Sequence, residues 1–182
     1  ISDGVFSKSK SLISNNQIKP KYNNTIAIRG TLTKAFTDID EKNISLFLGS
    51  NFHHVIYPVN SNGDLNFIAI MKYKLSIEEQ NNYSLFSQDS FIKKVLDKTF
   101  LVNGELMSHI KELKIFPIFV SDNFYQLKNN NIHLIGDAFF AFPPSFAQGA
   151  SQSIEAAYEL FESIENNTES NFFKNRVNKT KM

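Results

Sequence analysis

Apolar and polar residues alternate along four successive segments in the first half of the chain, over 25–32, 45–48, 53–59 and 65–73. Alternation with a period of two is typical of half-buried β-strands, because successive side chains point to opposite faces of a sheet. The pair Asn62-Gly63 between the last two segments supplies the positive φ angles of a tight hairpin turn. The pattern therefore predicts an antiparallel sheet.

The apolar spacing becomes helical after the fourth segment. Apolar residues such as Phe91 and Val95 recur between charged residues over 87–100, which predicts an amphipathic helix that covers the sheet. A short second helix is predicted over 105–113. An extended segment over 114–120 follows, and Pro117 favours an edge position for it.

Strand, loop and helix follow one another in the last third of the chain. Residues 131–135 predict a short apolar strand, and residues 149–165 predict a helix. The apolar residues on one face of this helix are Ile154, Ala157, Tyr158, Phe161 and Ile164. The polar tail from residue 166 is expected to be a frayed helix or disordered.

Composition narrows the class of protein. The 182 residues suffice for one sizeable core, or for one domain plus part of another. A net charge of +1 provides no field that attracts nucleic acid. The absence of cysteine excludes disulfides and thiolate metal sites and suits a cytoplasmic protein. No apolar run approaches the roughly 18 residues that cross a bilayer, so no integral membrane association is expected.

The candidate chemistry lies where the apolar segment 131–135 ends in Gly136-Asp137. A carboxylate at the C-terminal end of a strand is well placed to accept hydrogen bonds from the hydroxyl groups of a sugar. A helix that begins near Gly149 leaves unpaired N–H groups, which can bind an electron-rich carbonyl or an anionic ring. We assign no metal site, because His53 and His54 are strand neighbours and point to opposite faces.

Two motifs resemble those of a known family. The series Gly136-Asp137-Ala138, Pro143-Pro144, Gln148-Gly149 and Ile154-Glu155 resembles the Gly-Asp motif of FAD-dependent aromatic hydroxylases in order and spacing. The opening Asp3-Gly4, followed by serines and Lys10, looks like the Asp-Gly motif of the same family, with lysine in place of the usual arginine. The resemblance implies that this element lies near the cofactor pyrophosphates, where a lysine supplies charge but not a bidentate fork. The segment between the motifs is similar to the substrate-domain strands of salicylate-hydroxylase-like members.

The resemblance implies an α/β fold with α+β character in this chain. It places FAD-domain segments at 1–20 and 121–165, an antiparallel substrate-binding sheet at 21–120 and a polar tail at 166–182. The implied FAD-binding residues are Asp3, Gly4, Lys10, Gly136, Asp137, Pro144, Gln148, Gly149 and Ala150. NAD(P)H would then reduce the flavin, and O2 would form a C4a-hydroperoxide that hydroxylates an aromatic or similar electron-rich small molecule. No side chain is assigned as catalytic acid or base.

Departures from the family pattern leave alternatives open. Phe140 replaces a frequent histidine, Ala147 a glycine, Ser151 an asparagine and Ala156 an aspartate. No two of the seven glycines have Gly-x-Gly spacing, so we expect the dinucleotide fingerprint in a missing N-terminal part of the same polypeptide. One alternative is a degenerate, non-catalytic relative that binds an apolar ligand or a partner. The other is an epoxidase or halogenase of the same fold.

Overall fold

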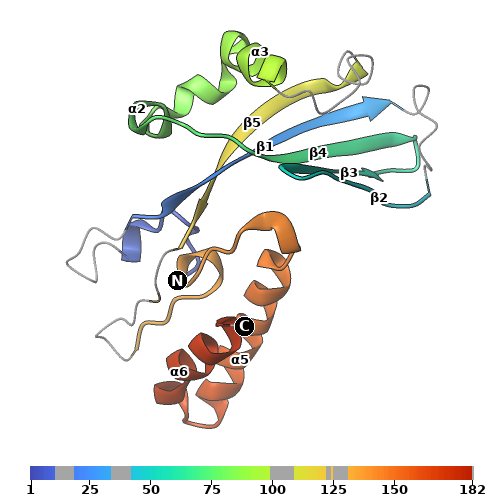
Figure 1. Ribbon diagram of the computed structural model, residues 1–182. Helices are drawn as coiled ribbons and strands as arrows, with labels where there is room; N and C mark the ends of the chain where they lie inside the picture. The colour runs from blue at the N-terminus through green and yellow to red at the C-terminus, as the bar shows by residue number, and fades with distance from the viewer. Residues whose placement is uncertain (11–18, 34–41, 99–108, 122–123, 125–130, 182) are drawn as a thin grey trace. The chain divides into compact units, whose positions relative to one another are not determined.

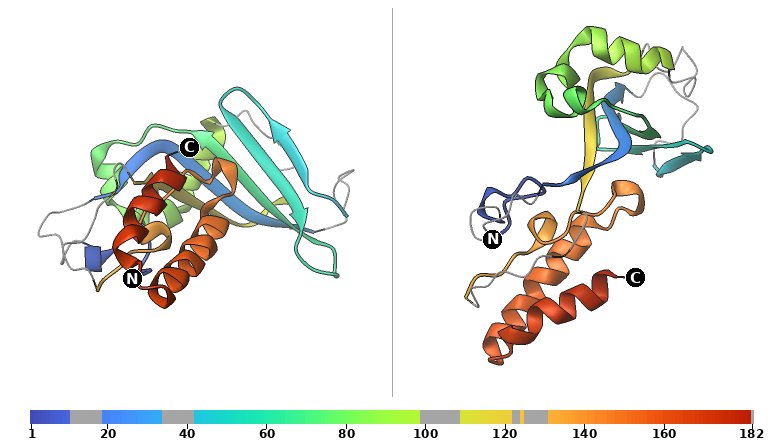
Figure 2. Two further views of the ribbon diagram at one scale, coloured as in Figure 1. Left: turned by 90° about the horizontal axis from the view of Figure 1, so that it is seen from below. Right: turned by 60° about the vertical axis from the view of Figure 1, so that its left-hand side comes forward.

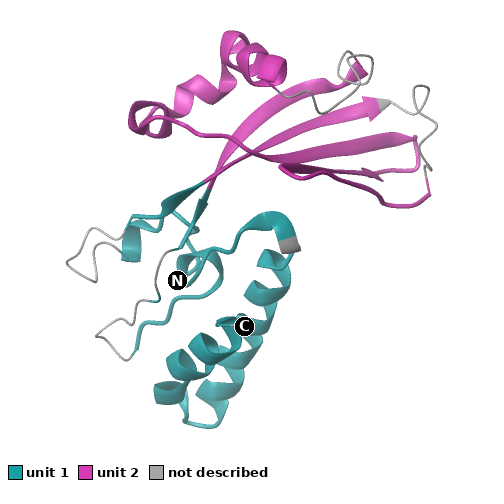
Figure 3. Cartoon of the chain, in the orientation of Figure 1, with its two compact units in different colours: residues 1–23, 119–182 teal, residues 24–118 magenta. Residues whose placement is uncertain are grey.

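The computed structural model describes residues 1–10, 19–33, 42–98, 109–121, 124 and 131–181. The chain forms two compact units (Figure 3). We call residues 24–118 the sheet unit, and residues 1–23 with 119–182 the helix unit. No helix in the described part of the chain is both long and apolar enough to cross a membrane.

The sheet has five strands in the order β2-β3-β4-β1-β5 (Figure 1). The strands are β1 (Lys21–Thr33), β2 (Ser45–Leu48), β3 (Phe52–Pro58), β4 (Asp64–Lys72) and β5 (Lys111–Val120). The pairs β2–β3, β3–β4 and β1–β4 are antiparallel. The predicted antiparallel sheet is therefore confirmed.

The predicted hairpin joins β3 to β4. The Val59 N–H donates to the Asp64 carbonyl at 3.0 Å, and Gly63 has a φ of 87°. The Asn60 side-chain oxygen accepts from the N–H groups of Asn62 and Asp64, at 3.0 and 3.2 Å. The hairpin is therefore confirmed, but only Gly63 of the predicted Asn62-Gly63 pair has a positive φ, and the asparagine that closes the turn with its side chain is Asn60.

One face of the sheet forms the core of the sheet unit. Residues that share this face by register and are fully buried include Ile26, Leu32, Ile56, Leu65 and Phe67. The helical segments α2 (Ile77–Asn81), η2 (Tyr83–Ser87) and α3 (Asp89–Lys98) lie on one side of the sheet in the views of Figures 1 and 2. Phe91 and Val95 of α3 are buried, which confirms the predicted amphipathic helix.

The predicted second helix over 105–113 is wrong at residues 111–113, which begin β5; residues 105–108 lie outside the described part of the chain. Pairing with β1 overrides the local apolar spacing. A Cβ at Gly30 of β1 would collide with Ile110 and lie 2.8 Å from the Lys111 carbonyl oxygen, so glycine makes this close approach possible. β5 is an edge strand, as Pro117 predicts.

The helix unit contains η3 (Gly136–Ala138), η4 (Pro144–Phe146), α5 (Gly149–Glu165) and α6 (Glu169–Thr180). The predicted bounds of the helix over 149–165 are confirmed. The predicted strand over 131–135 is wrong: no strand is assigned there, although Ile135 has extended backbone angles and residues 133 and 135 form backbone hydrogen bonds with Ile1. A strand assignment needs a ladder of neighbours, which one residue does not provide.

The polar tail is an ordered helix that packs on α5, rather than a frayed or disordered segment. Arg176 is buried in this contact, with an exposed fraction of 1%, and Phe172, which is 2% exposed, packs edge-on against the His133 ring at 5.5 Å. Arg176 donates to Glu159 at 3.1 Å and to the Gln152 side-chain oxygen at 2.8 Å. Because these acceptors compensate the guanidinium charge, a helix of polar composition can still be buried on one side.

Candidate functional site

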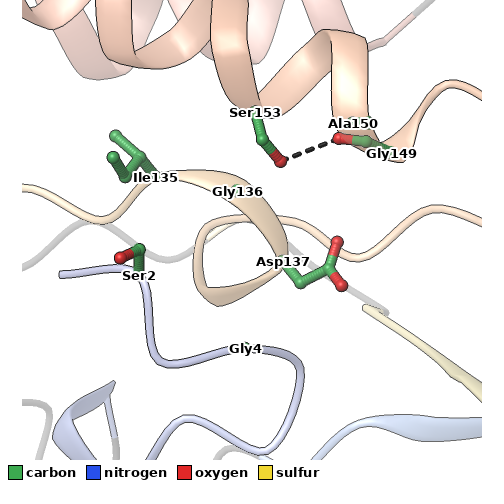
Figure 4. Close-up of a pocket in the computed structure, with 8 residues that line it drawn as sticks. All are labelled: Ser2, Gly4, Ile135, Gly136, Asp137, Gly149, Ala150 and Ser153. Atoms are coloured by element: carbon green, nitrogen blue, oxygen red, sulfur yellow. Dashed lines mark hydrogen bonds between the residues drawn. The ribbon is translucent and has the colours of Figure 1, made fainter.

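The Asp-Gly and Gly-Asp segments meet around one pocket in the helix unit, although 132 residues separate Ile1 from His133 (Figure 4). The pocket has a volume of about 480 Å³. Its lining residues are Ser2, Gly4, Ile135, Gly136, Asp137, Gly149, Ala150 and Ser153. The fold therefore joins the two motifs to the first turns of α5.

Backbone hydrogen bonds hold the first motif beside the second. The Ile1 nitrogen donates to the His133 carbonyl at 2.7 Å, and the Ile135 N–H donates to the Ile1 carbonyl at 3.0 Å. One residue that bonds to both neighbours of Leu134 has the pattern of a parallel strand pair. This pairing brings Ser2 to the edge of the pocket.

The Asp-Gly turn is organised by its own side chains. Gly4 has a φ of 83°, a conformation that favours glycine, and no atom lies within 4 Å of where its Cβ would be. The Asp3 carboxylate accepts from the Ser9 N–H at 3.1 Å. Its hydrogen bond with the Ser7 side chain is the main cause that lowers the pKa of Asp3 to about 2. Asp3 thus shapes the turn and does not line the pocket.

Lys10 is buried, with an exposed fraction of 5%, and does not line the pocket. Burial lowers the pKa of its ammonium group, and the nearby Asp3 opposes this shift. Lys10 therefore contributes no side chain to this pocket, and its predicted role in cofactor binding stays a prediction.

The Gly-Asp turn packs directly against α5. Gly136 has a φ of 60°, and a Cβ there would lie 3.1 Å from the Ser153 hydroxyl oxygen, which itself donates to the Gly149 carbonyl at 2.7 Å. The Asp137 carboxylate projects from this turn in Figure 4, and partial burial raises its pKa. Within the described chain no hydrogen-bond donor contacts this carboxylate, so it is available to a ligand.

The start of α5 provides the donors of the site. Gln148 precedes the helix, but its side chain makes no capping hydrogen bond. The N–H groups of Gly149 and Ala150 have no partner among the described residues and belong to pocket-lining residues. No atom lies within 4 Å of where a Gly149 Cβ would be, so a ligand can approach the backbone closely. The partial positive charge of a 17-residue helix favours an electron-rich group here.

Five of the nine predicted cofactor-binding residues line the pocket: Gly4, Gly136, Asp137, Gly149 and Ala150. Asp3, Lys10, Pro144 and Gln148 do not. The prediction missed Ser2, Ile135 and Ser153. Helical spacing offered a signal for Ser153, because it lies four residues after Gly149 and shares its face of the helix.

The departures from the family pattern have distinct environments. Ala147 has a φ of 52°, in the left-handed region where glycine is favoured, so the backbone keeps the glycine-like conformation without a glycine. Ala156 is 2% exposed, and an aspartate at this position would be buried. Phe140 stacks on Phe124 with ring centroids 4.5 Å apart. Among the described residues, no group of three or more histidines and carboxylates could hold a metal ion.

Comparison with solved structures shows that the fold is that of FAD-dependent aromatic hydroxylases. A variant of HpxO from Klebsiella pneumoniae, complexed with FAD, superimposes with a TM-score of 0.77 at 16% identity, over 96% of this chain and 46% of the other. The 2,6-dihydroxypyridine-3-hydroxylase from Arthrobacter nicotinovorans gives a TM-score of 0.73 at 15% identity, over 96% of this chain and 51% of the hydroxylase. A salicylate hydroxylase substrate complex gives a TM-score of 0.63 at 18% identity, over 87% of this chain and 43% of the other.

The chain thus spans about half the length of these solved structures. A scan of protein-family models and a search of curated proteins each found no match to the sequence.

Proposed function

We propose that this chain is part of a flavin-dependent monooxygenase that uses NAD(P)H and O2 to hydroxylate an aromatic or similar electron-rich small molecule. The observation that carries the proposal is the junction of both motifs at one pocket on the helix unit. The similar HpxO structures are complexed with FAD, one of them also with uric acid, which supports this class of cofactor and substrate.

The pocket residues suit part of FAD. The backbone at Gly4 and Gly149 leaves open space for a ligand, and Asp137 offers a carboxylate to hydroxyl groups. The N–H groups of Gly149 and Ala150 would donate to the electron-rich edge of the flavin ring. The bound flavin would supply the redox chemistry with NAD(P)H and O2. No described side chain is assigned as an acid or base.

The remainder of the cofactor needs a second binding element. No Gly-x-Gly sequence is present in the 182 residues, and the chain matches only about half of its structural neighbours. We therefore propose that an upstream part of the same polypeptide carries the dinucleotide fingerprint. The lack of cysteine is in keeping with a cytoplasmic location.

A non-catalytic relative is the second candidate. Buried Lys10 and the four departures from the family pattern favour it. The glycine-like φ of Ala147 opposes it, because the loop keeps its course despite the substitution. Epoxidation or halogenation by the same fold is a variant of the first proposal, since fold and site do not determine the reaction.

The visible absorption spectrum of the gene product that contains this sequence, purified without added cofactor, tests the proposal. A flavin spectrum, followed by substrate-dependent NAD(P)H oxidation, would support the monooxygenase. A colourless protein that also fails to bind added FAD would support the non-catalytic relative.

Replacement of Asp137 tests the role of the pocket. We expect Asp137→Ala to weaken FAD binding about ten-fold or more, because a charged hydrogen-bond acceptor is lost. Asp137→Asn keeps one oxygen acceptor and should weaken FAD binding less. Burial raises the pKa of Asp137, so the charged carboxylate adds no stability to the protein without cofactor, and the melting temperature of both variants should not fall. Unchanged FAD affinity, or equal losses of affinity and stability, would contradict the assignment.

A further inference from the structure

Strand β2 forms one edge of the sheet, because among the described strands it pairs with β3 alone (Figure 1). Three large apolar side chains on and beside this strand are exposed: Ile44, Leu46 and Leu48, by 71%, 56% and 76%. Alternate residues of an extended segment point to the same face, so the three lie side by side. We call Ile44, Leu46 and Leu48 the β2 edge patch.

The backbone of the β2 edge patch also faces outward. The Gly49 N–H donates to the Phe52 carbonyl of β3 at 2.9 Å. In an antiparallel pair, alternate residues of a strand direct their N–H and C=O groups to the same neighbour. Phe47 and Ser45 therefore bond to β3, in the register that pairs them with residues 54 and 56. The patch residues between them turn their N–H and C=O groups to the open edge.

The opposite edge of the sheet has a different character. Strand β5 carries the exposed charged residues Lys111, Glu112 and Lys114. Pro117 follows, and Glu112 departs from strand geometry with a φ of 53°. Charged side chains, proline and local distortion all discourage pairing with a further strand. Residues 43–52 around β2 contain no charged residue and no proline, so the β2 edge lacks these protective features.

We propose that the β2 edge pairs antiparallel with the β2 edge of a second copy of this chain, in a two-fold symmetric dimer. A register centred on Leu46 places Leu46 opposite its own copy and Ile44 opposite Leu48. These are the residues whose backbone groups face outward, so one register joins both the hydrogen bonds and the apolar side chains.

Other two-fold registers fit less well. A register centred on Leu48 would place Ile44 opposite Phe52, which belongs to β3. A register centred on Ile44 would place Leu46 opposite the charged Lys42. The self-complementary pattern around Leu46 is what identifies a second copy as the occupant, since an isologous contact presents the same patch from both sides. This contact uses both edges, so assembly stops at the dimer.

Sedimentation equilibrium of the gene product that contains this sequence tests the dimer. We expect a dimer for the parent and a monomer for both Leu46→Lys and Leu46→Asp at the same concentration, because like charges would lie opposite each other. An equimolar mixture of these two variants should recover the dimer, since opposite charges then meet. Ile77→Lys, at a residue of α2 that is 78% exposed, is the control and should remain dimeric.

Three results of this experiment would overturn the proposal. They are a monomeric parent, a dimer that Leu46→Lys leaves intact, and a mixture of the two charged variants that stays monomeric. An assembly larger than a dimer would also contradict the closed contact.

The Leu46→Cys variant tests the register without a disruptive charge. Directly opposed residues that share hydrogen bonds have Cα atoms about 5.5 Å apart, which a disulfide can span. The 182 residues contain no cysteine, so oxidation should join two copies at position 46. Ser50→Cys, at an exposed residue one turn beyond the patch, is the control and should give no covalent dimer beyond the parent's level. Equal yields from the two variants, or none from Leu46→Cys, would overturn the proposal. Neither experiment requires bound FAD, so the outcome is independent of the proposed function.

Discussion

The sheet unit and the helix unit differ in how far nearby sequence determines their structure. The sheet unit is one continuous segment, and most of its strands, its hairpin and α3 follow the alternating and helical patterns; the start of β5 departs from them, where pairing with the distant β1 replaces the predicted helix. The helix unit combines two segments from opposite ends of the sequence, and there the predicted strand over 131–135 and the predicted frayed or disordered tail are wrong. Local periodicity predicts an element well when its packing partners are also local.

The largest expected effect is the loss of unfolding free energy after a core substitution in the sheet unit, and it tests whether the two units unfold separately. Phe67 has no exposed surface, so Phe67→Ala should cost about 3 to 5 kcal/mol of unfolding free energy. Phe47→Ala, at a residue that is 41% exposed, is the control and should cost far less. Denaturant unfolding gives the free energies, and hydrogen exchange shows which amides lose protection. Equal loss of amide protection in β4 and α5 would show that the two units unfold as one.

Arg176 provides the corresponding test in the helix unit. Its guanidinium is buried against α5, so Arg176→Ala should cost about 3 kcal/mol because Glu159 and Gln152 lose their partner. Lys179 also pairs with Glu155, at 3.1 Å, but is 47% exposed, so Lys179→Ala should cost about 1 kcal/mol or less. Denaturant unfolding followed by circular dichroism measures both. Equal costs would mean that burial of Arg176 does not hold α6 in place.

A smaller effect is expected at the loop before α5. Ala147 has a positive φ, so Ala147→Gly should stabilise the protein by about 1 kcal/mol. Ala150→Gly, in the first turn of α5, should instead destabilise it, by about 0.5 to 1 kcal/mol. Thermal unfolding of the protein without cofactor compares them. Destabilisation by both variants would indicate that the strain at Ala147 is relieved in solution.

The smallest expected effect is the pH dependence at Asp3. Hydrogen bonding lowers its pKa from 3.8 to about 2, so the charged form favours the folded state. This contribution is complete above the unfolded pKa of 3.8 and is lost as the pH falls through about 2. Asp3→Asn should therefore be less stable than the parent near neutral pH, and the difference should shrink in this acid range. Urea unfolding at several pH values across this range checks the direction of the change. A stability difference independent of pH would contradict the stabilising role of the charged Asp3.

Some of the predicted site residues line the pocket, and the glycines among them share a local cause. Gly4, Gly136 and Gly149 stand where the backbone turns or a ligand can approach, and such positions favour glycine whatever lies around them. Lys10 was assigned through the resemblance of its segment to the Asp-Gly motif, and its predicted place near the pyrophosphates stays a prediction; the burial of its side chain depends on packing that the motif does not encode. Ser2 belongs to the site only because distant backbone pairing brings it there.

The sequence by itself determined the alternating strands, the Asn-Gly hairpin and the bounds of α5, because periodicity and turn chemistry act between neighbouring residues. Only the tertiary structure decided that Ile1 forms backbone hydrogen bonds with His133 and Ile135 and that α6 buries Arg176. It also decided that the apolar side of α5, with Ile154 and Phe161, faces away from α6. These features depend on hydrogen bonds, charge compensation and burial between segments far apart in the chain. A local pattern shows that an apolar face exists, but not which layer covers it.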